Sequence, residues 1–233
     1  MSTSSATPFN WPPLESNPEV FSAYMSAMGL PSSWVFGEVY GFDDDLLAFI
    51  PRPVLAVIVN IERLNRAEDV LKGDPSLLKD VPYYMKQNGK LDNACGVIAC
   101  LHAIFNCQDV ISLEEGKTLS TYLHTALNQS PEERASTLEN STDFQEVHKT
   151  FASQGQTTQA SEQSDVKHHF VVFVVDKKGR LLELDGTKKG PLVVNEKCED
   201  VLKGSVMEIQ RRLAKQEISE RLSMITLNAK GGE

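Results

Sequence analysis

Three side chains of this sequence have the types that nucleophilic catalysis needs: a thiol, an imidazole and a carboxylate. Cys95 comes immediately before apolar residues that recur at three- and four-residue spacing, which predicts a buried helix. A helix start favours negative charge, so the pKa of a thiol there should fall below its reference value of about 8.5. His169 opens one strand-like run and Asp185 follows another. A cysteine at a helix start with a histidine and an aspartate on neighbouring strands is the papain-type arrangement of nucleophile, base and orienting group.

Each of these residues also has a structural interpretation. A cysteine among apolar residues is most often a small core residue. A histidine that opens a strand is usually structural, and Asp185-Gly186 after a strand is usually a turn. Residue types alone therefore leave both interpretations open.

Longer stretches of the sequence resemble the ubiquitin carboxyl-terminal hydrolases of the short, single-domain type, from about Trp11 to the C-terminus. The stretches that carry the resemblance are residues 11–20, 39–41, 81–87, 93–96, 101–103, 130–135, 183–186 and 222–227. The resemblance implies an α+β fold, a papain-like α-β-α sandwich in which helices flank a central, mainly antiparallel sheet. It also implies a knotted chain.

The resemblance further implies roles for single residues. Cys95 matches the family's nucleophile, His169 its general base and Asp185 the group that orients the imidazole. Gln87 matches the glutamine whose side-chain amide helps to hold the oxyanion. The segment between Gln87 and the nucleophile is two residues longer than is usual in the family. Because residues 88–92 are mostly polar and contain glycine, we expect them to bulge outward.

The implied partner is ubiquitin, with ubiquitin-like modifiers as a second class. The formal net charge of -9 argues against a nucleic-acid binder and suits a basic segment such as the arginine-bearing tail of ubiquitin. The expected ubiquitin contacts are Leu14, Glu15, Glu19, Glu38, Gly155, Gln156, Thr157 and His168. The three glutamates among them have an equally good alternative interpretation as solvated surface carboxylates.

Composition indicates one globular domain in a reducing compartment. The chain has 233 residues, 41% of them hydrophobic, which suffices for one sizeable core. No secretory signal pattern opens the sequence and no apolar run is long enough to span a bilayer, so we expect a monomer without membrane contact. Its expected location is the cytoplasm, with the nucleus as a second location. The four cysteines have no metal-ligand spacing, and we expect neither a metal nor a cofactor.

Local signals place the elements that must position these residues. Asn17 followed by Pro18 predicts a helix start, Ser130 to Glu133 forms a capping-box pattern, and residues 54–59 read as a central strand. Residues 176–179 predict a hairpin turn between the strands that carry His169 and Asp185, and residues 200–216 predict a helix.

Three segments make up the expected domain plan: a flexible end over residues 1–9, a single catalytic domain over residues 10–233 and, within it, a polar stretch over residues 153–165. In the resembled family, the equivalent of this stretch crosses the active-site cleft.

The function predicted from these features is a deubiquitinating cysteine peptidase that hydrolyses small or unfolded adducts from the C-terminal glycine of ubiquitin. Two alternatives from other classes remain at this point: a catalytically weak ubiquitin-binding module, and another acyl-transfer enzyme with the same three catalytic residue types.

Overall fold

A computed structural model describes residues 9–152 and 168–231. Its centre is a six-stranded sheet in the order β1-β6-β2-β3-β4-β5, with every neighbouring pair antiparallel. The strands are β1 (Trp34–Glu38), β2 (Val54–Glu62), β3 (His168–Val175), β4 (Leu181–Leu184), β5 (Leu192–Asn195) and β6 (Ser223–Ala229). The α-helices are α1 (Pro18–Ala27), α2 (Asp44–Ala48), α3 (Arg66–Asp69), α4 (Cys95–Phe105), α5 (Thr118–Ala126), α6 (Pro131–Glu139), α7 (Thr142–Ala152) and α8 (Val201–Ala214). Two single-turn 3-10 helices are η1 (Pro75–Lys79) and η2 (Gly89–Leu91).

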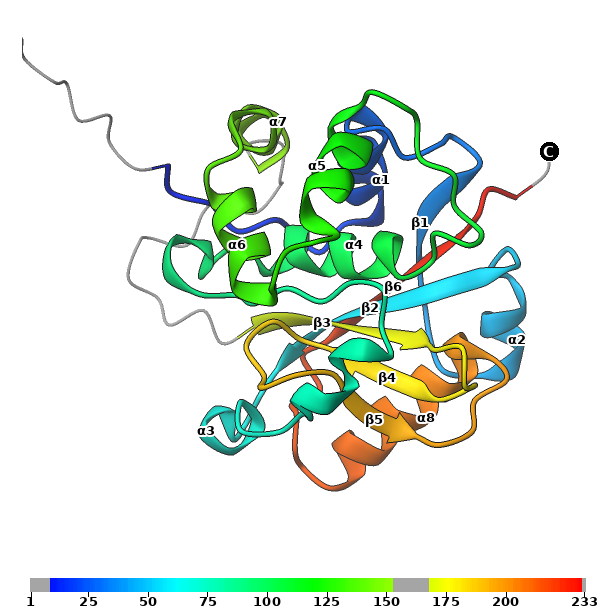
Figure 1. The fold of residues 1–233 in the computed structure, drawn as a ribbon. Coiled ribbons are helices and arrows are strands. Elements are labelled where there is room, and N and C mark those ends of the chain that lie inside the picture. The colour runs from blue at the N-terminus through cyan, green and yellow to red at the C-terminus, as the bar shows by residue number, and fades with distance from the viewer. Residues whose placement is uncertain (1–8, 153–167, 232–233) are drawn as a thin grey trace, which may run out of the picture.

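The central strands are apolar on both faces, and for this reason helices cover the sheet on both sides. In β2, Ala56 and Ile58 join the core beneath α1, α4, α5, α6 and α7, whereas Val57 and Val59 join the core beneath α8. Strand β3 alternates in the same way. Figure 1 shows the larger helical layer on one side of the sheet and α8 on the other. The α+β sandwich implied by the sequence is therefore confirmed.

The predicted helix starts are also confirmed. The side chain of Asn17 accepts hydrogen bonds from the amides of Glu19 and Val20, and Pro18 occupies the first turn of α1. In α6, the Ser130 hydroxyl accepts from the Glu133 amide while the Glu133 carboxylate accepts from the Ser130 amide. Both devices satisfy amides that have no partner within the helix.

The hairpin between β3 and β4 brings two of the candidate catalytic residues to the same end of the sheet. Val172 pairs with Leu184, so His169 near the start of β3 and Asp185 just beyond β4 approach each other. Helix α4 packs across β2 and β3 and begins at this end. The β3–β4 hairpin and the start of α4 therefore lie at the same end of the sheet (Figure 1).

One expectation about the ends and loops of the chain needs adjustment, and another lies outside the described residues. Phe9, assigned above to the flexible end, packs edge-on against Trp11 with ring centroids 5.2 Å apart. The polar stretch over residues 153–165 and residues 1–8 lie outside the described part of the chain.

The expected outward bulge over residues 88–92 is only partly right. Residues Gly89–Leu91 form the single turn η2, and Lys90 reaches Glu139 of α6 at 2.8 Å on the surface. Leu91, however, points inward and is fully buried. The hydrophobic free energy of burying this leucine, about 1.5–3 kcal/mol, explains why the inserted segment folds onto the domain.

Within the described ranges, no helix is long and apolar enough to cross a membrane. All four cysteines lie in the described part of the chain and carry free thiols.

Leu101 provides a test of the core that positions α4. Its side chain is fully buried between the sheet and the outer helices. We expect Leu101→Ala to lower the free energy of unfolding by about 2–5 kcal/mol, through lost transfer energy and an unfilled cavity. Leu71→Ala is the matched control, because this leucine is 61% exposed. Urea unfolding of both variants measures the difference, and equal effects would contradict the packing described.

Candidate active site

The thiol of Cys95 lies at the first residue of α4 and is almost completely buried. The sulfur is hydrogen-bonded to the His169 imidazole and to the backbone amides of Gly96 and Phe170. Burial alone would raise the pKa of this thiol, but the imidazole and the two amides outweigh burial and lower it. The sequence-based expectation of an activated thiol agrees with this environment.

His169 connects the thiol to a buried carboxylate. Its Nε2 lies 2.8 Å from Oδ1 of Asp185, which leaves Nδ1 for the sulfur of Cys95. Burial would lower the pKa of His169, but the charge and hydrogen bond of Asp185, together with Cys95, raise it to about 9. The lowered pKa of the thiol and the raised pKa of the imidazole both favour a thiolate beside an imidazolium, which is the reactive form of a cysteine nucleophile.

Asp185 is held by several donors at once. Oδ1 also accepts from the amide and the hydroxyl of Thr187, at 2.9 and 2.8 Å, and Oδ2 accepts from Arg63 at 3.1 Å. Burial would raise the pKa of this carboxyl, yet His169, Arg63 and Lys188 hold it well below its usual range. Asp185 consequently stays ionised across the pH range in which the thiol and imidazole titrate.

Gln87 lies beside this group but has a partner of its own. Its side-chain Nε2 donates to the carbonyl of Asp92 at 2.8 Å, while its Oε1 is buried with no hydrogen-bond partner within the described part of the chain. An amide nitrogen carries two hydrogens, so one remains for a substrate oxygen. The carbonyl of Asp92, the residue that follows η2, therefore orients the side-chain amide of Gln87.

Comparison with known proteins assigns the family. The sequence profile described as ubiquitin carboxyl-terminal hydrolase, family 1, matches residues 11–214. The chain belongs to this family.

Several curated relatives agree with the assignment over nearly their full length. A probable ubiquitin carboxyl-terminal hydrolase of Dictyostelium discoideum is 34% identical, with 96% of this chain and 90% of the relative covered. The ubiquitin carboxyl-terminal hydrolase of Aplysia californica is 36% identical, with 87% of this chain and 94% of the relative covered. The human ubiquitin carboxyl-terminal hydrolase isozyme L1 is 31% identical, with 92% of this chain and 96% of the relative covered.

A solved structure shows the same fold. The catalytic domain of Trichinella spiralis UCH37, crystallised with ubiquitin vinyl methyl ester, superposes with a TM-score of 0.74. The alignment covers 95% of this chain and 96% of that domain at 22% sequence identity. This likeness supports the ubiquitin carboxyl-terminal hydrolase fold.

Of the expected ubiquitin contacts, Leu14 lies beside the start of the helix that carries the thiol. Leu14 packs against the start of α4, where a Cβ placed on Gly96 would lie 3.3 Å from the Leu14 Cβ. The hydroxyl of Ser16 meets that of Ser223 at 2.6 Å, which ties this segment to the start of β6. Glu15 lies between the two anchored residues, so the segment follows the same end of the sheet as the site.

The remaining expected ubiquitin contacts are more dispersed. Glu19 in the first turn of α1, Glu38 at the end of β1 and His168 at the start of β3 are all exposed. In the strand order, β6 and β2 separate Glu38 from β3, the strand that carries His169. Gly155, Gln156 and Thr157 lie outside the described residues.

Several positioning contacts of the site escaped the sequence analysis. The amide of Met85 donates to Nε2 of His102 in α4 at 3.0 Å, and the Tyr84 hydroxyl donates to the Asp185 carbonyl at 2.6 Å. Burial lowers the pKa of His102 to about 3, so this ring stays neutral and can accept. The segment that carries Gln87 is thereby fastened both to the helix of the thiol and to the turn of the orienting carboxylate.

Gly186 tests how closely these two segments must approach. The amide of Gln87 donates to the Gly186 carbonyl at 2.9 Å, and an added Cβ on Gly186 would lie 2.8 Å from that amide nitrogen and 2.9 Å from the Met85 carbonyl oxygen. We expect Gly186→Ala to cost about 1–3 kcal/mol of stability, because backbone cannot yield as a flexible side chain can. We also expect a drop in kcat/KM of about 10-fold or more, since the displaced segments carry Gln87 and Asp185.

Gly231→Ala is the control, because its added Cβ would make only ordinary contact with Pro51 at 3.4 Å. Thermal unfolding and hydrolysis of a ubiquitin C-terminal amide measure both effects. An unchanged Gly186→Ala variant would show that the close approach does not constrain the site.

Proposed function

We propose that this member of the ubiquitin carboxyl-terminal hydrolase family is a deubiquitinating cysteine hydrolase in which Cys95, His169 and Asp185 form the catalytic triad. The single observation that carries the assignment is the continuous buried chain of contacts from the Cys95 sulfur through His169 to Asp185. A module that only binds ubiquitin has no need for a lowered thiol pKa opposite a raised imidazole pKa.

The geometry supports a two-step acyl transfer. The Cys95 thiolate attacks the carbonyl carbon of ubiquitin's C-terminal glycine, which is bonded to the nitrogen of the adduct. The carbonyl oxygen becomes an oxyanion. The second amide hydrogen of Gln87 and the Cys95 backbone amide at the start of α4 are the proposed donors to it. When the tetrahedral intermediate collapses, protonated His169 gives its proton to the leaving amine and a thioester remains.

Hydrolysis of the thioester reverses the proton flow. Neutral His169 takes one proton from water as the water oxygen attacks the thioester carbonyl, and the C–S bond then breaks to restore the thiolate beside the imidazolium. The product leaves as a carboxylic acid, which releases its remaining proton to solvent. Asp185 keeps the imidazole oriented through both steps because its hydrogen bond to Nε2 fixes Nδ1 as the working nitrogen.

The proposed substrate is ubiquitin, with ubiquitin-like modifiers as a second class. Support comes from the family assignment and from the acidic side chains of Glu15, Glu19 and Glu38, which suit a basic, extended substrate tail. Leu14 and His168 belong to the same proposed contact set. We further propose that the protein acts as a cytoplasmic, and also nuclear, monomer.

The nucleophile is tested by substitution at Cys95. We expect Cys95→Ser to lose at least about 10³-fold in hydrolysis of a ubiquitin C-terminal amide, because serine lacks a low-pKa thiol, while ubiquitin affinity is retained. Single-turnover hydrolysis and calorimetric binding measure the two properties.

Cys198→Ser serves as the control, because this thiol has a raised pKa and lies under α8, away from His169. A ubiquitin probe with a thiol-reactive C-terminus should label the parent and the control variant, and should fail to label Cys95→Ser. Comparable turnover by Cys95→Ser would refute the triad.

Adduct size is the second test of the proposed function. Following the family resemblance, we propose that the enzyme acts on small or unfolded adducts. We expect ubiquitin with a short C-terminal peptide to be cleaved at least about 10²-fold faster than diubiquitin, because loss of correct positioning at the reacting bond costs rates of this order. Parallel kcat/KM measurements decide the matter, and equal rates would remove the size restriction while leaving the triad in place.

A further inference from the structure

The two oxygens of the Asp185 carboxylate have different partners. Oδ1 accepts from His169 and from both donors of Thr187. Oδ2 accepts from Nη1 of Arg63 at 3.1 Å, and among the described residues no other donor contacts it. The Asp185 side chain has no exposed area and that of Arg63 is 5% exposed, so water does little to screen this pair.

We propose that Arg63 is a positioning residue of this hydrolase, which holds the second oxygen of Asp185 and, through Asp185, controls the protonation of the His169 imidazole. The inference deepens the proposed function, since it rests on catalysis by Cys95 with His169 as its acid and base.

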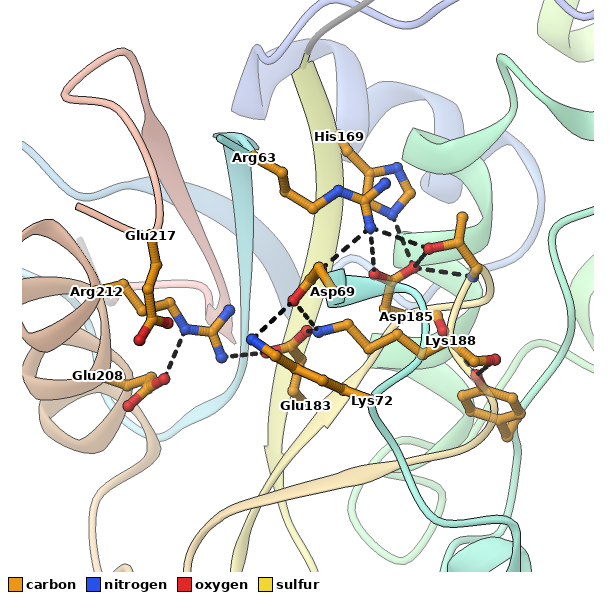
Figure 2. A network of polar contacts seen from close by, with 12 residues as sticks. Arg63, Asp69, Lys72, His169, Glu183, Asp185, Lys188, Glu208, Arg212 and Glu217 are labelled. Carbon is orange, nitrogen blue, oxygen red and sulfur yellow. Dashed lines mark hydrogen bonds and ion pairs between the residues drawn. The ribbon is translucent and has the colours of Figure 1, made fainter. Parts of the chain in front are cut away.

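The fold delivers Arg63 to this position. Strand β2 pairs with β3 so that Ile61 lies opposite His169, and Arg63 follows two residues later. A bridge between Arg63 and Ile218 holds its backbone beyond the end of the strand. Figure 2 shows the guanidinium between Asp69 and the His169–Asp185 pair.

One nitrogen of Arg63 makes all of these contacts. Nη1 lies 3.1 Å from Asp185 Oδ2, 3.3 Å from Asp69 Oδ2 and 3.0 Å from the Thr187 hydroxyl oxygen. The guanidinium therefore acts here as a point charge rather than as a bidentate hydrogen-bond donor. A lysine ammonium, which has three hydrogens, could satisfy the same three acceptors.

Asp69 joins Arg63 to a larger buried network (Figure 2). Its other oxygen lies 3.1 Å from Nζ of Lys188, which in turn lies 2.5 Å from Glu183. Glu183 also pairs with Arg212 of α8, and Arg212 reaches Glu208 at 2.6 Å.

The charged side chains of this network alternate in sign. The cations whose side chains are nearly buried are Arg63, Lys188 and Arg212, and the anions are Asp69, Glu183, Asp185 and Glu208. From more exposed positions, Lys72 lies 3.3 Å from Asp69 and Arg211 lies 2.8 Å from Glu208. Asp185 is the anion that contacts His169, and its buried negative charge favours the protonated ring, whereas the positive charge of Arg63 on the same carboxylate opposes that form.

Two substitutions should consequently move the imidazole in opposite directions. The groups that face His169 are Cys95 from α4, Asp185 from the turn after β4 and, beyond that carboxylate, Arg63 with Asp69. Arg63→Met removes a positive charge, so the imidazolium should persist to higher pH. Asp69→Asn removes a negative charge while leaving Arg63 beside Asp185, so the imidazolium should lose its proton at lower pH.

The experiment measures the pH dependence of kcat/KM for a ubiquitin aminocoumarin amide and the titration of the His169 ring by NMR. The alkaline limb and the ring titration should rise by about half a pH unit or more in Arg63→Met, and should fall by a similar amount in Asp69→Asn. We expect kcat of Arg63→Met to drop about 10-fold with KM within about twofold, since Asp185 Oδ2 loses its donor and the substrate is not contacted.

Two further variants separate positioning from general destabilisation. Arg63→Lys keeps the charge and should restore the alkaline limb and most of kcat. Arg66→Met is the matched control, because Arg66 lies in the same segment but is exposed, and it should match the parent. General loss of stability would not displace the titration in opposite directions.

The outcomes can be distinguished from failure of the proposed function. If the parent does not hydrolyse the ubiquitin amide, the proposed function fails, while the NMR titrations still test Arg63. Shifts in the same direction for Arg63→Met and Asp69→Asn, or no shift in either, would overturn the inference. If Arg63→Met does not fold, then the opposite titration of Asp69→Asn and rescue by Arg63→Lys decide the matter, and an unshifted Asp69→Asn overturns it.

Discussion

The buried negative charge of Asp185 is the constraint on which the site depends. A carboxylate with no exposed area is stable only if its oxygens are fully hydrogen-bonded and its charge is matched nearby. Thr187 provides local donors from the same turn, but the matching charges come from His169 and from Arg63 at the end of β2. The environment of Asp185 therefore depends on the pairing of the hairpin with β2. This dependence links the chemistry to the sheet register rather than to any single loop.

The same reasoning explains why the backbone around the site is so closely fastened. His102 accepts from the Met85 amide, Tyr84 donates to the Asp185 carbonyl, and the Gln87 amide donates to the Gly186 carbonyl. These bonds join the helix of the thiol, the segment that carries Gln87 and the turn of the Asp185 carboxylate into one unit. Because the bonds are made within the protein itself, the reacting groups are held close together before any substrate binds. Prior positioning of this kind lowers the entropic part of a reaction barrier.

Local signals made part of this structure predictable from sequence. The Asn17 cap, the Ser130 capping box and the turn between β3 and β4 each depend on residues within four positions, and each is present. The inserted segment was harder to predict because its composition is mostly polar, whereas its one leucine, Leu91, determines its packing. The contact between Arg63 and Asp185 spans 122 positions and depends on strand order, which periodicity does not encode. No motif marks Arg63, and only the assembled sheet reveals it.

The buried ion network also bears on a balance between stability and activity. Well-packed apolar residues often stabilise a core as well as or better than buried ion pairs do, so stability alone does not account for Glu183, Lys188 and Arg212. An apolar core at this place would remove the Lys188 ammonium from Asp69 and would alter the potential at the imidazole. The network instead extends the balance of charge from the active-site end of the sheet to α8 on its other face (Figure 2). Each charge in this series has an opposite charge beside it, and at one end of the series Asp185 meets the His169 imidazole, which contacts the Cys95 thiol.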